Sequence, residues 1–448
     1  MTTSHGGSAD DVRMRGFARR DTVEAAIAWL DAQLHRLPSE TLPIRSAAGR
    51  VLAESITSDI EVPGFDRAMM DGYAVVAEST DGATEYNRLP LQIIGESLPG
   101  RAFSGLVGAG QAVRIMTGAP MPRGANAVLP AEWVSVAVTL RVTSALDTGA
   151  TLGLLQTTAA GDHHDPKGTQ RDGYIDATAA LSPEKHVGKR GEDVAAGSQL
   201  FESGRALRPQ DLGLLSSVGI AQVAAIRKPL VRLVITGNEL LPAGSPPHGC
   251  RVADANGPML AALVERDGGI VDFPGLVPDD RESILSAIQS DADVVIVSGG
   301  SSVGEEDFVP TLLAEHGELA IHGIAMRPSS PTGMGKLGDR LVFLLPGNPV
   351  SCLCAYDFFA GRAIRALGGR AKQWPYRSFV APLARKISSP IGRLDYARVQ
   401  WIENRLEPIS IGGASILSST TRADGFVIVP ADSEGYPPGS EVEVWLYD

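Results

Sequence analysis

The stretch between residues 229 and 369 alternates short apolar runs with longer amphipathic runs, and this alternation constrains the fold more than any other feature. The short runs are rich in Val, Ile and Leu, as buried strands are, while the longer runs have helical spacing. Strands are predicted at Val231–Ile235, Ile270–Phe273, Val294–Val297, Leu319–Ala325 and Leu341–Leu345, and helices at Met259–Asp267, Arg281–Ser290, Phe308–His316 and Val350–Leu367. Such alternation predicts a mostly parallel sheet covered by helices on both faces.

The regions on either side of this stretch have a different pattern. Short β-prone runs broken by Gly and Pro fill residues 51–145, which predicts a β-rich domain. Residues 375–448 return to similar runs with polar turns, which predict a small β-barrel or sandwich. A helix is predicted from Asp21 to Leu34, and residues 200–228 are expected to be mostly helical.

Two segments raise the question of a metal site. Residues 146–180 are rich in Gly, Thr, Ala and Asp, and they predict a weakly ordered surface insertion. Its central Gly161-Asp162-His163-His164-Asp165 could bind a metal, but a solvated loop is the preferred interpretation because nothing indicates rigid ligands. Cys352 and Cys354 lie in an apolar run with the wrong spacing for a zinc knuckle, so they are interpreted as packing thiols.

Net charge limits the partners of the chain. The 448 residues suit three or four domains and carry a net charge of −12. A uniformly acidic chain does not coat nucleic acid or an anionic membrane, so neither is an expected partner, and an anionic ligand needs a local site. The first 20 residues lack the apolar core of a signal peptide, and no apolar run is long enough to span a membrane, so we expect a cytoplasmic protein.

Every predicted strand of the α/β stretch ends in small, polar or turn residues. Ligands of open α/β sheets bind outside these carboxyl ends, where Gly lets the backbone approach and hydroxyls donate hydrogen bonds. Carboxylates in the same loops would hold a divalent cation that bridges to phosphate, so the loops predict an anion site with Mg²⁺. No Walker A, GxGxxG or GxSxG motif is present. The loops are Thr236-Gly237-Asn238-Glu239, Ser298 to Asp307, Met326 to Pro331 and Pro346-Gly347-Asn348-Pro349.

Seven motifs in order resemble the molybdopterin molybdenumtransferase (MoeA) family and the matching E domain of gephyrin-type proteins. The resemblance covers about residues 16–135 and 183–448, and seven ordered motifs are far more specific than one. They are Val62 to Val75 with Met69-Met70-Asp71-Gly72-Tyr73-Ala74, Arg114 to Pro120, Arg190 to Asp193, Thr236 to Leu240 with Asp254-Ala255-Asn256, Ser298 to Asp307, Pro346 to Ser351, and Gly392 to Tyr396.

The resemblance implies a multi-domain α/β and β fold with four parts. A segmented helical region would comprise residues 16–50 and 181–225, with a β-domain inserted at residues 51–180. A three-layer, molybdopterin-binding α/β domain would follow at residues 226–370, and a C-terminal β-barrel at residues 371–448.

The resemblance also implies an activity. The family inserts molybdate into adenylylated molybdopterin with Mg²⁺ or a similar cation and releases AMP. It acts as a homodimer, which would bring Asp71 and Thr117 to the site across the interface. Molybdopterin adenylyltransferase and apo-molybdoenzymes are implied as protein partners. The implied catalytic residues are Asp71, Thr117, Asp307, Arg327 and Arg393; the cofactor-binding residues are Thr236, Gly237, Asn238, Glu239, Asn256, Ser298, Gly299, Gly300, Pro346, Gly347 and Asn348; and the metal ligands are Asp254, Asp307, Glu192 and Asp193.

One loop departs from the family pattern, which commonly reads Lys-Pro-Gly-Lys-Pro. Here the loop is Arg327-Pro328-Ser329-Ser330-Pro331, so the first cation is kept as Arg and the second is lost at Ser330. The change predicts weaker molybdate affinity with metal insertion retained. A stand-alone molybdopterin adenylyltransferase would share only the α/β domain. A divergent molybdopterin-binding or scaffold protein without metal insertion is the remaining alternative.

Overall fold

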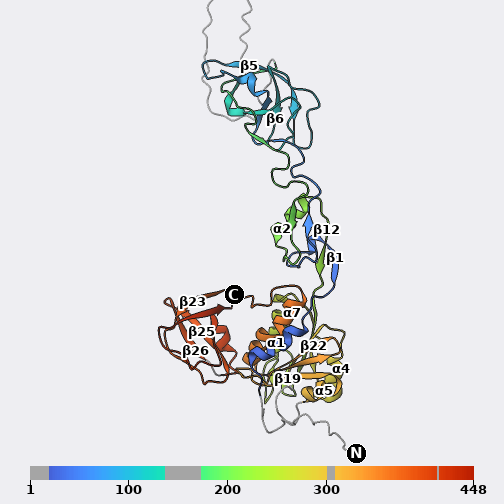
Figure 1. Cartoon of the computed structure of the whole chain (residues 1–448), viewed down its shortest axis with the longest axis vertical. Helices are drawn as coiled ribbons and strands as arrows, with labels where there is room; N and C mark the ends of the chain where they lie inside the picture. The colour runs from blue at the N-terminus through green and yellow to red at the C-terminus, as the bar shows by residue number, and fades with distance from the viewer. Residues whose placement is uncertain (1–19, 137–172, 300–307, 411–412, 448) are drawn as a thin grey trace, which may run out of the picture. The chain divides into compact units, whose positions relative to one another are not determined.

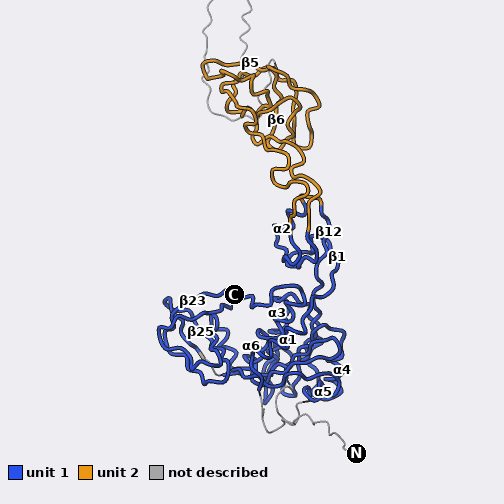
Figure 2. Tube along the Cα trace, viewed as in Figure 1, with its two compact units in different colours: residues 1–55, 202–216, 220–448 blue, residues 56–201, 217–219 orange. Residues whose placement is uncertain are grey.

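The computed structural model describes residues 20–136, 173–299, 308–410 and 413–447. The chain divides into two compact units, each with its own core (Figure 2). Unit 1 comprises residues 1–55, 202–216 and 220–448, and unit 2 comprises residues 56–201 and 217–219. Within the described ranges, no helix has the length and apolar character needed to cross a membrane.

The centre of unit 1 is a mostly parallel sheet, as the sequence predicts. Strand β21 is antiparallel to both of its neighbours, and it escaped prediction because two of its five residues are glycine. The path of the sheet is β16 (Ile270–Asp272), β13 (Leu230–Thr236), β18 (Val294–Ser298), β22 (Arg340–Leu345), β21 (Gly333–Leu337) and β19 (Glu318–His322), with β17 (Leu276–Val277) beside β13.

Helices cover both faces of this sheet, so the predicted three layers are confirmed (Figure 1). Side chains alternate along β13, where Val231 and Leu233 enter one core and Val234 enters the other. The predicted helix after β22 is continuous but contains a π-helical turn, η4. The first core is covered by α1 (Val23–Gln33), α3 (Asn256–Arg266), α6 (Pro349–Ala355), η4 (Tyr356–Ala360) and α7 (Gly361–Leu367); α4 (Arg281–Ile288) and α5 (Phe308–His316) cover the second.

The first described residues are held by hydrogen bonds to the chain that follows β19. Thr22 caps α1, because its Oγ1 accepts a hydrogen bond from the Ala25 N–H at 3.1 Å. The Asp21 N–H donates to the Gly323 carbonyl at 3.0 Å, and the Asp21 carbonyl accepts from the Ala325 N–H at 2.8 Å. These bonds place Arg20 beside the segment that follows β19.

The C-terminal residues of unit 1 form a small barrel. Its strands are β23 (Ser378–Pro382), β25 (Leu394–Ile402), β26 (Arg405–Ser410), β27 (Gly425–Val429) and β29 (Glu441–Leu446). The Ala384 N–H donates to the Leu406 carbonyl at 2.8 Å, which brings the chain after β23 back to β26. The start of β25 pairs in parallel with β20 (Met326–Arg327) from the α/β stretch, and this pairing aligns Arg327 with Asp395.

A smaller element of unit 1 corrects the sequence prediction for residues 200–228. Only α2 (Pro209–Ser217) is helical there, whereas β12 (Gln222–Ile226) is a strand paired with β1 (Ser39–Pro43). The side chains of Val223 and Ala225 in β12 are buried at alternate positions. This alternation of buried side chains, which is typical of a strand, outweighed the helical propensity of the segment.

Unit 2 is built on a six-stranded sheet. Strand β9 pairs with both β5 and β8, so the predicted surface insertion is wrong at residues 174–177. The rest of that predicted insertion up to residue 172, with Gly161 to Asp165, lies outside the described residues. The strand order is β7 (Ala127–Pro130), β4 (Gly72–Val75), β6 (Gln111–Ile115), β5 (Leu89–Ser97), β9 (Tyr174–Ala177) and β8 (Val134–Val136).

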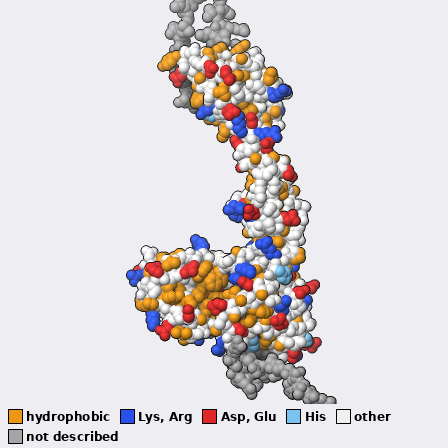
Figure 3. All heavy atoms as spheres, viewed as in Figure 1, with side chains coloured by type: hydrophobic (Ala, Val, Ile, Leu, Met, Phe, Trp, Pro, Cys, Tyr) orange, Lys and Arg blue, Asp and Glu red, His pale blue; other side chains and the backbone are white. Residues whose placement is uncertain are grey.

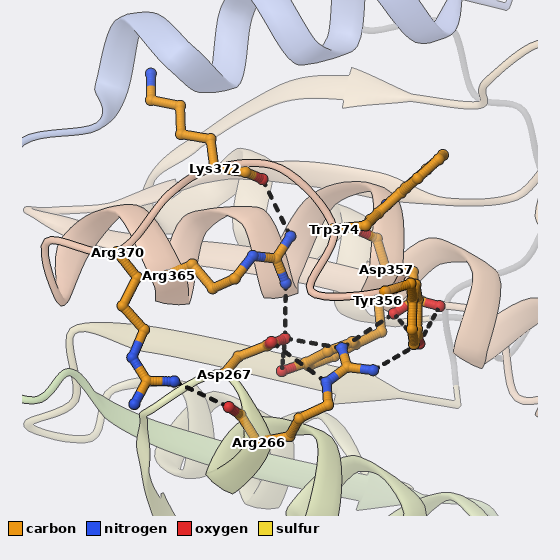
Figure 4. Close-up of polar contacts among 9 residues, drawn as sticks. Arg266, Asp267, Tyr356, Asp357, Arg365, Arg370, Lys372 and Trp374 are labelled. Carbon is orange, nitrogen blue, oxygen red and sulfur yellow. Dashed lines mark hydrogen bonds and ion pairs between the residues drawn. The ribbon is translucent and has the colours of Figure 1, made fainter. Parts of the chain in front are cut away.

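A buried polar network lies where α3 ends (Figure 4). The carboxylate of Asp267 has no solvent exposure and forms ion pairs with Arg365 at 2.9 Å and Arg266 at 3.0 Å. It also accepts a hydrogen bond from the Tyr356 hydroxyl at 3.0 Å. Burial raises the pKa of the neighbouring Asp357 to about 6, although Arg266 favours its charged form. The network ties the end of α3 to η4 and α7.

Candidate active site

The first of two adjoining cavities lies at the carboxyl ends of β13 and β18 and has a volume of about 510 Å³. An added Cβ at Gly299, where φ is +103°, would lie 2.0 Å from the Thr236 carbonyl oxygen, so only glycine lets these two loops meet. Of the residues predicted from the sequence, Thr236, Glu239, Asp254, Asn256, Ser298, Gly299, Gly347 and Asn348 line this cavity.

Asn256 joins the loops around the first cavity. Its Nδ2 donates to Ser298 Oγ at 2.9 Å and to the Gly347 carbonyl at 2.7 Å. Its Oδ1 is buried and has no hydrogen-bond partner among the described residues. An orphaned buried acceptor beside a cavity is the position in which a cation or a ligand donor compensates the lost hydration.

Asp254 supplies a carboxylate to the same cavity. One of its oxygens accepts the Gly257 N–H at 2.8 Å at the start of α3, and an added Cβ at Gly257 would lie 2.2 Å from the other oxygen. Glu239 lines the cavity as a second carboxylate. These two acids and Asn256 Oδ1 offer the hard oxygen donors that Mg²⁺ prefers together with substrate phosphates. Gly300 and Asp307, also predicted here, lie outside the described residues.

The second cavity has a volume of about 610 Å³ and shares Asn348 with the first. Three arginines line it, Arg20, Arg327 and Arg393, together with Pro346 from the predicted set. Arg327 forms an ion pair with Asp395, and Arg393 Nε lies 3.3 Å from the other oxygen of that carboxylate. Two guanidinium groups against one carboxylate leave a net charge of about +1, before Arg20 is added.

The loop that departs from the family pattern forms part of the second cavity. Ser329, at the position of the family's Gly, has φ +89°, which a non-glycine residue adopts only at a cost. Its hydroxyl donates to the Ser351 carbonyl, and its own carbonyl accepts from Thr332 Oγ1 at 2.8 Å. Ser330 also lines the cavity, so the missing lysine charge would have faced it.

Asp71 and Thr117 come together within unit 2. Asp71 Oδ1 accepts hydrogen bonds from the Thr117 N–H at 2.7 Å and from Thr117 Oγ1 at 2.8 Å. These bonds, the backbone one first, lower the pKa of Asp71 below its ordinary value. Pairing of β4 with β6 aligns Gly72 with Ile115 and so brings the two residues into contact. Met69, two residues before Asp71, and Met116, directly before Thr117, are 56% and 39% exposed.

The other two predicted acids also belong to unit 2. Glu192 forms an ion pair with Arg67 at 2.8 Å and accepts the Lys189 N–H at 2.9 Å. The Arg67 guanidinium is the first cause of a lowered pKa of Glu192. Asp193 follows it in the chain, and its N–H donates to the Val62 carbonyl at 3.0 Å. Across the described ranges, no group of three or more His, Cys, Asp or Glu side chains is arranged to hold a metal ion.

Two residues of this site were not predicted from the sequence: Arg20, which lines the second cavity, and Asp395, which contacts two of its arginines. Arg20 lies among the first 20 residues, for which the sequence predicts no role in a site. Asp395 belongs to the motif Gly392 to Tyr396, but the sequence alone predicted no role for it. A charged residue within the otherwise apolar start of β25 (Leu394–Ile402) was the available signal, because a buried charge needs a partner.

Comparison with known proteins covers nearly the whole chain. Three family models match: the MoeA N-terminal region (domain I and II) at residues 21–219, a probable molybdopterin binding domain at residues 232–366, and the MoeA C-terminal region (domain IV) at residues 380–447. A molybdopterin molybdenumtransferase of Haemophilus influenzae is 32% identical over 426 residues, which cover 92% of this chain and 95% of that protein. Molybdopterin molybdenumtransferase 2 of Mycobacterium tuberculosis is 31% identical over 421 residues, which cover 90% and 94%.

Solved structures give the same result. Two crystal structures of a molybdopterin biosynthesis MoeA protein from Pyrococcus horikoshii are 32% and 29% identical to this chain. Their TM-scores are 0.75 and 0.72, and each comparison covers 96% of this chain and 100% of the other. The α/β and β architecture described above is therefore shared along the full length.

Proposed function

Because the chain belongs to the molybdopterin molybdenumtransferase (MoeA) family, we propose that its two adjoining cavities divide the substrates of metal insertion between them. The protein is a molybdenum-transferring enzyme of molybdenum cofactor biosynthesis, and molybdopterin is its substrate. The observation that carries the proposal is the shared edge: hydroxyls, amides and acids line one cavity, arginines line the other, and Asn348 borders both.

The first cavity receives the phosphate end of adenylylated molybdopterin. Thr236 and Ser298 offer hydroxyl donors, and Gly299 lets the backbone approach phosphate oxygens closely. The further residues proposed to bind this substrate there are Gly237, Asn238, Glu239, Asn256, Gly300, Gly347 and Asn348. Pro346, which lines the second cavity, is also proposed to bind it. Release of AMP accompanies metal insertion in this proposal.

A divalent cation, Mg²⁺, fits the oxygen donors of the first cavity. Asp254 and Asn256 Oδ1 would hold it together with substrate phosphate, and Asp307 is the further acid proposed from the sequence. A cation bound there would neutralise phosphate charge as AMP leaves. The Nδ2 of Asn256 donates hydrogen bonds to Ser298 and Gly347, and these bonds fix the orientation of the side-chain amide. Asn256 Oδ1 is therefore already oriented as a ligand for the cation.

The second cavity attracts molybdate, which is a tetrahedral dianion. Arg327 and Arg393 supply fixed positive charge and forked N–H donors, and Arg20 adds a third guanidinium to the lining. Local charge of this kind is needed because the chain as a whole carries −12 and repels anions at long range. Acidic and basic side chains are interspersed on the described face in Figure 3, which presents no extended basic surface there.

Formation of molybdenum cofactor from adenylylated molybdopterin at rising molybdate concentrations tests the function. We expect saturable activity, and we expect Ser330→Lys to lower the half-saturating molybdate concentration about 3- to 10-fold, because one more cation faces the cavity. Ser378→Lys, which adds the same charge on β23 outside both cavities, should change nothing. Binding of adenylylated molybdopterin with no cofactor formed at any molybdate concentration would instead identify a divergent binding protein.

We further propose that the active form is a homodimer in which Asp71 and Thr117 of one chain complete the site of the other. Exposed Met69 and Met116 beside them support a contact surface. We expect the Asp71→Asn and Asp254→Asn variants to be inactive alone. When the two are mixed, half of the dimers should be hybrids, and each hybrid has one intact site out of two. The mixture should therefore recover about a quarter of wild-type activity. Absence of rescue, with hybrids confirmed by native mass spectrometry, would show that each site is built from one chain.

The cellular setting is also a proposal. The cysteines Cys250, Cys352 and Cys354 are all free thiols, which fits a reducing compartment, and we place the enzyme in the cytoplasm. Molybdopterin adenylyltransferase, as supplier of the substrate, and apo-molybdoenzymes, as acceptors of the product, are the proposed protein partners.

A further inference from the structure

The carboxylate of Asp395 lies beneath the second cavity without being exposed in it. The side chain has no solvent exposure, and the residue does not line the cavity. One oxygen, Oδ2, accepts hydrogen bonds from Arg327 Nη2 and from Ser389 Oγ, the latter at 2.8 Å. The other oxygen, Oδ1, faces Arg393 Nε at 3.3 Å. A single buried carboxylate therefore contacts both arginines.

The two arginines reach this carboxylate from different parts of unit 1. Arg327 belongs to β20, in the α/β stretch, and Arg393 precedes β25 of the barrel. The parallel pairing of β20 with β25 sets Arg327 directly opposite Asp395. Arg327 and Arg393 remain 31% and 36% exposed, so each guanidinium contacts Asp395 on one side and lines the cavity on the other.

We propose that Asp395 is a positioning residue for the oxyanion: it holds the guanidinium groups of Arg327 and Arg393 in one orientation toward molybdate. This inference rests on the proposed function of the second cavity. Two long cationic side chains repel each other and lose rotamer freedom when they bind one ligand. A shared buried carboxylate removes both costs before the ligand arrives, and Ser389 orients the carboxylate in turn.

The Asp395→Asn variant separates positioning from simple charge. Loss of a negative charge beneath the cavity would by itself strengthen the binding of a dianion. Loss of positioning has the opposite effect, and we expect the half-saturating molybdate concentration to rise about 10-fold or more with kcat changed less than about 3-fold. The Kd of molybdate alone, measured by calorimetry, should rise in parallel. Asp424→Asn, which removes an exposed carboxylate of the same barrel, should leave both quantities unchanged.

A second measurement tests whether Asp395 acts on molybdate binding through the two arginines. In a variant that already carries Arg327→Ala and Arg393→Ala, adding Asp395→Asn should no longer raise the Kd of molybdate, because nothing remains to be positioned and only the loss of a repelling charge is left. Should Asp395→Asn fail to fold, Ser389→Ala keeps the charge and should raise the Kd about 2- to 5-fold. Unchanged or tighter molybdate binding in these single variants, or an undiminished effect without the arginines, overturns the inference. Wild-type protein that binds no molybdate overturns the proposed function instead.

Discussion

The Arg327→Ala variant is expected to need on the order of 10²-fold more molybdate for half-maximal cofactor formation than wild type. The substitution removes charge-assisted hydrogen bonds to the dianion, and it also leaves the buried carboxylate of Asp395 without its closest cation. Both effects act on the occupancy of the second cavity, whereas binding of adenylylated molybdopterin in the first cavity should persist. Titration of molybdate in the cofactor-formation assay measures the half-saturating molybdate concentration. Calorimetry with adenylylated molybdopterin measures whether the first cavity still binds that substrate.

The control for this variant is Arg385→Ala. Arg385 also forms an ion pair with a carboxylate, Glu407, but its side chain is 67% exposed and lies outside both cavities. Loss of this pair should leave the molybdate requirement as it is. If both variants respond alike, or if Arg327→Ala loses pterin binding rather than molybdate binding, the division of substrates between the cavities is wrong.

The second large effect is expected in the buried network of Figure 4, where Asp267→Ala should lower the unfolding free energy of unit 1 by about 3–5 kcal/mol. The substitution leaves Arg365, whose side chain is 4% exposed, and the Tyr356 hydroxyl without their shared acceptor. Unpaired buried charge is costly because the interior cannot replace its hydration. Urea unfolding, monitored by hydrogen exchange of the α3 and α7 amides, measures the lost unfolding free energy within unit 1.

Asp272→Ala provides the comparison, since it removes another Asp–Arg pair of unit 1, between two strands of its sheet. Its partner Arg232 lies at 3.1 Å, but the Asp272 side chain is 39% exposed, so we expect a loss of less than about 1 kcal/mol. Equal losses of unfolding free energy in the two variants would mean that the buried Asp267 pair stabilises unit 1 no more than the exposed Asp272 pair does.

Much of the α/β domain could be predicted because its signals are local. Strands β13, β18 and β22 are mostly apolar runs, with Arg232 the one charged residue away from their ends, and each lies within about one residue of its predicted position. The elements that escaped prediction have no such local signal. β21 contains two glycines, and the alternation in β12 matters only because β1, far away in the chain, pairs with it.

The candidate site divides in the same way between sequence and tertiary structure. The sequence itself determines which residue types follow each strand. It therefore also determines the kind of ligand expected at this edge of the sheet. The contacts of Asn256 with Ser298 and Gly347, and of Asp395 with Arg327, were decided only by the tertiary structure. They join segments that are distant in the chain and meet only in the folded protein. The pairing of β20 with β25 sets Arg327 opposite Asp395, and the pairing of β18 with β22 brings Ser298 beside Leu345, close to Gly347.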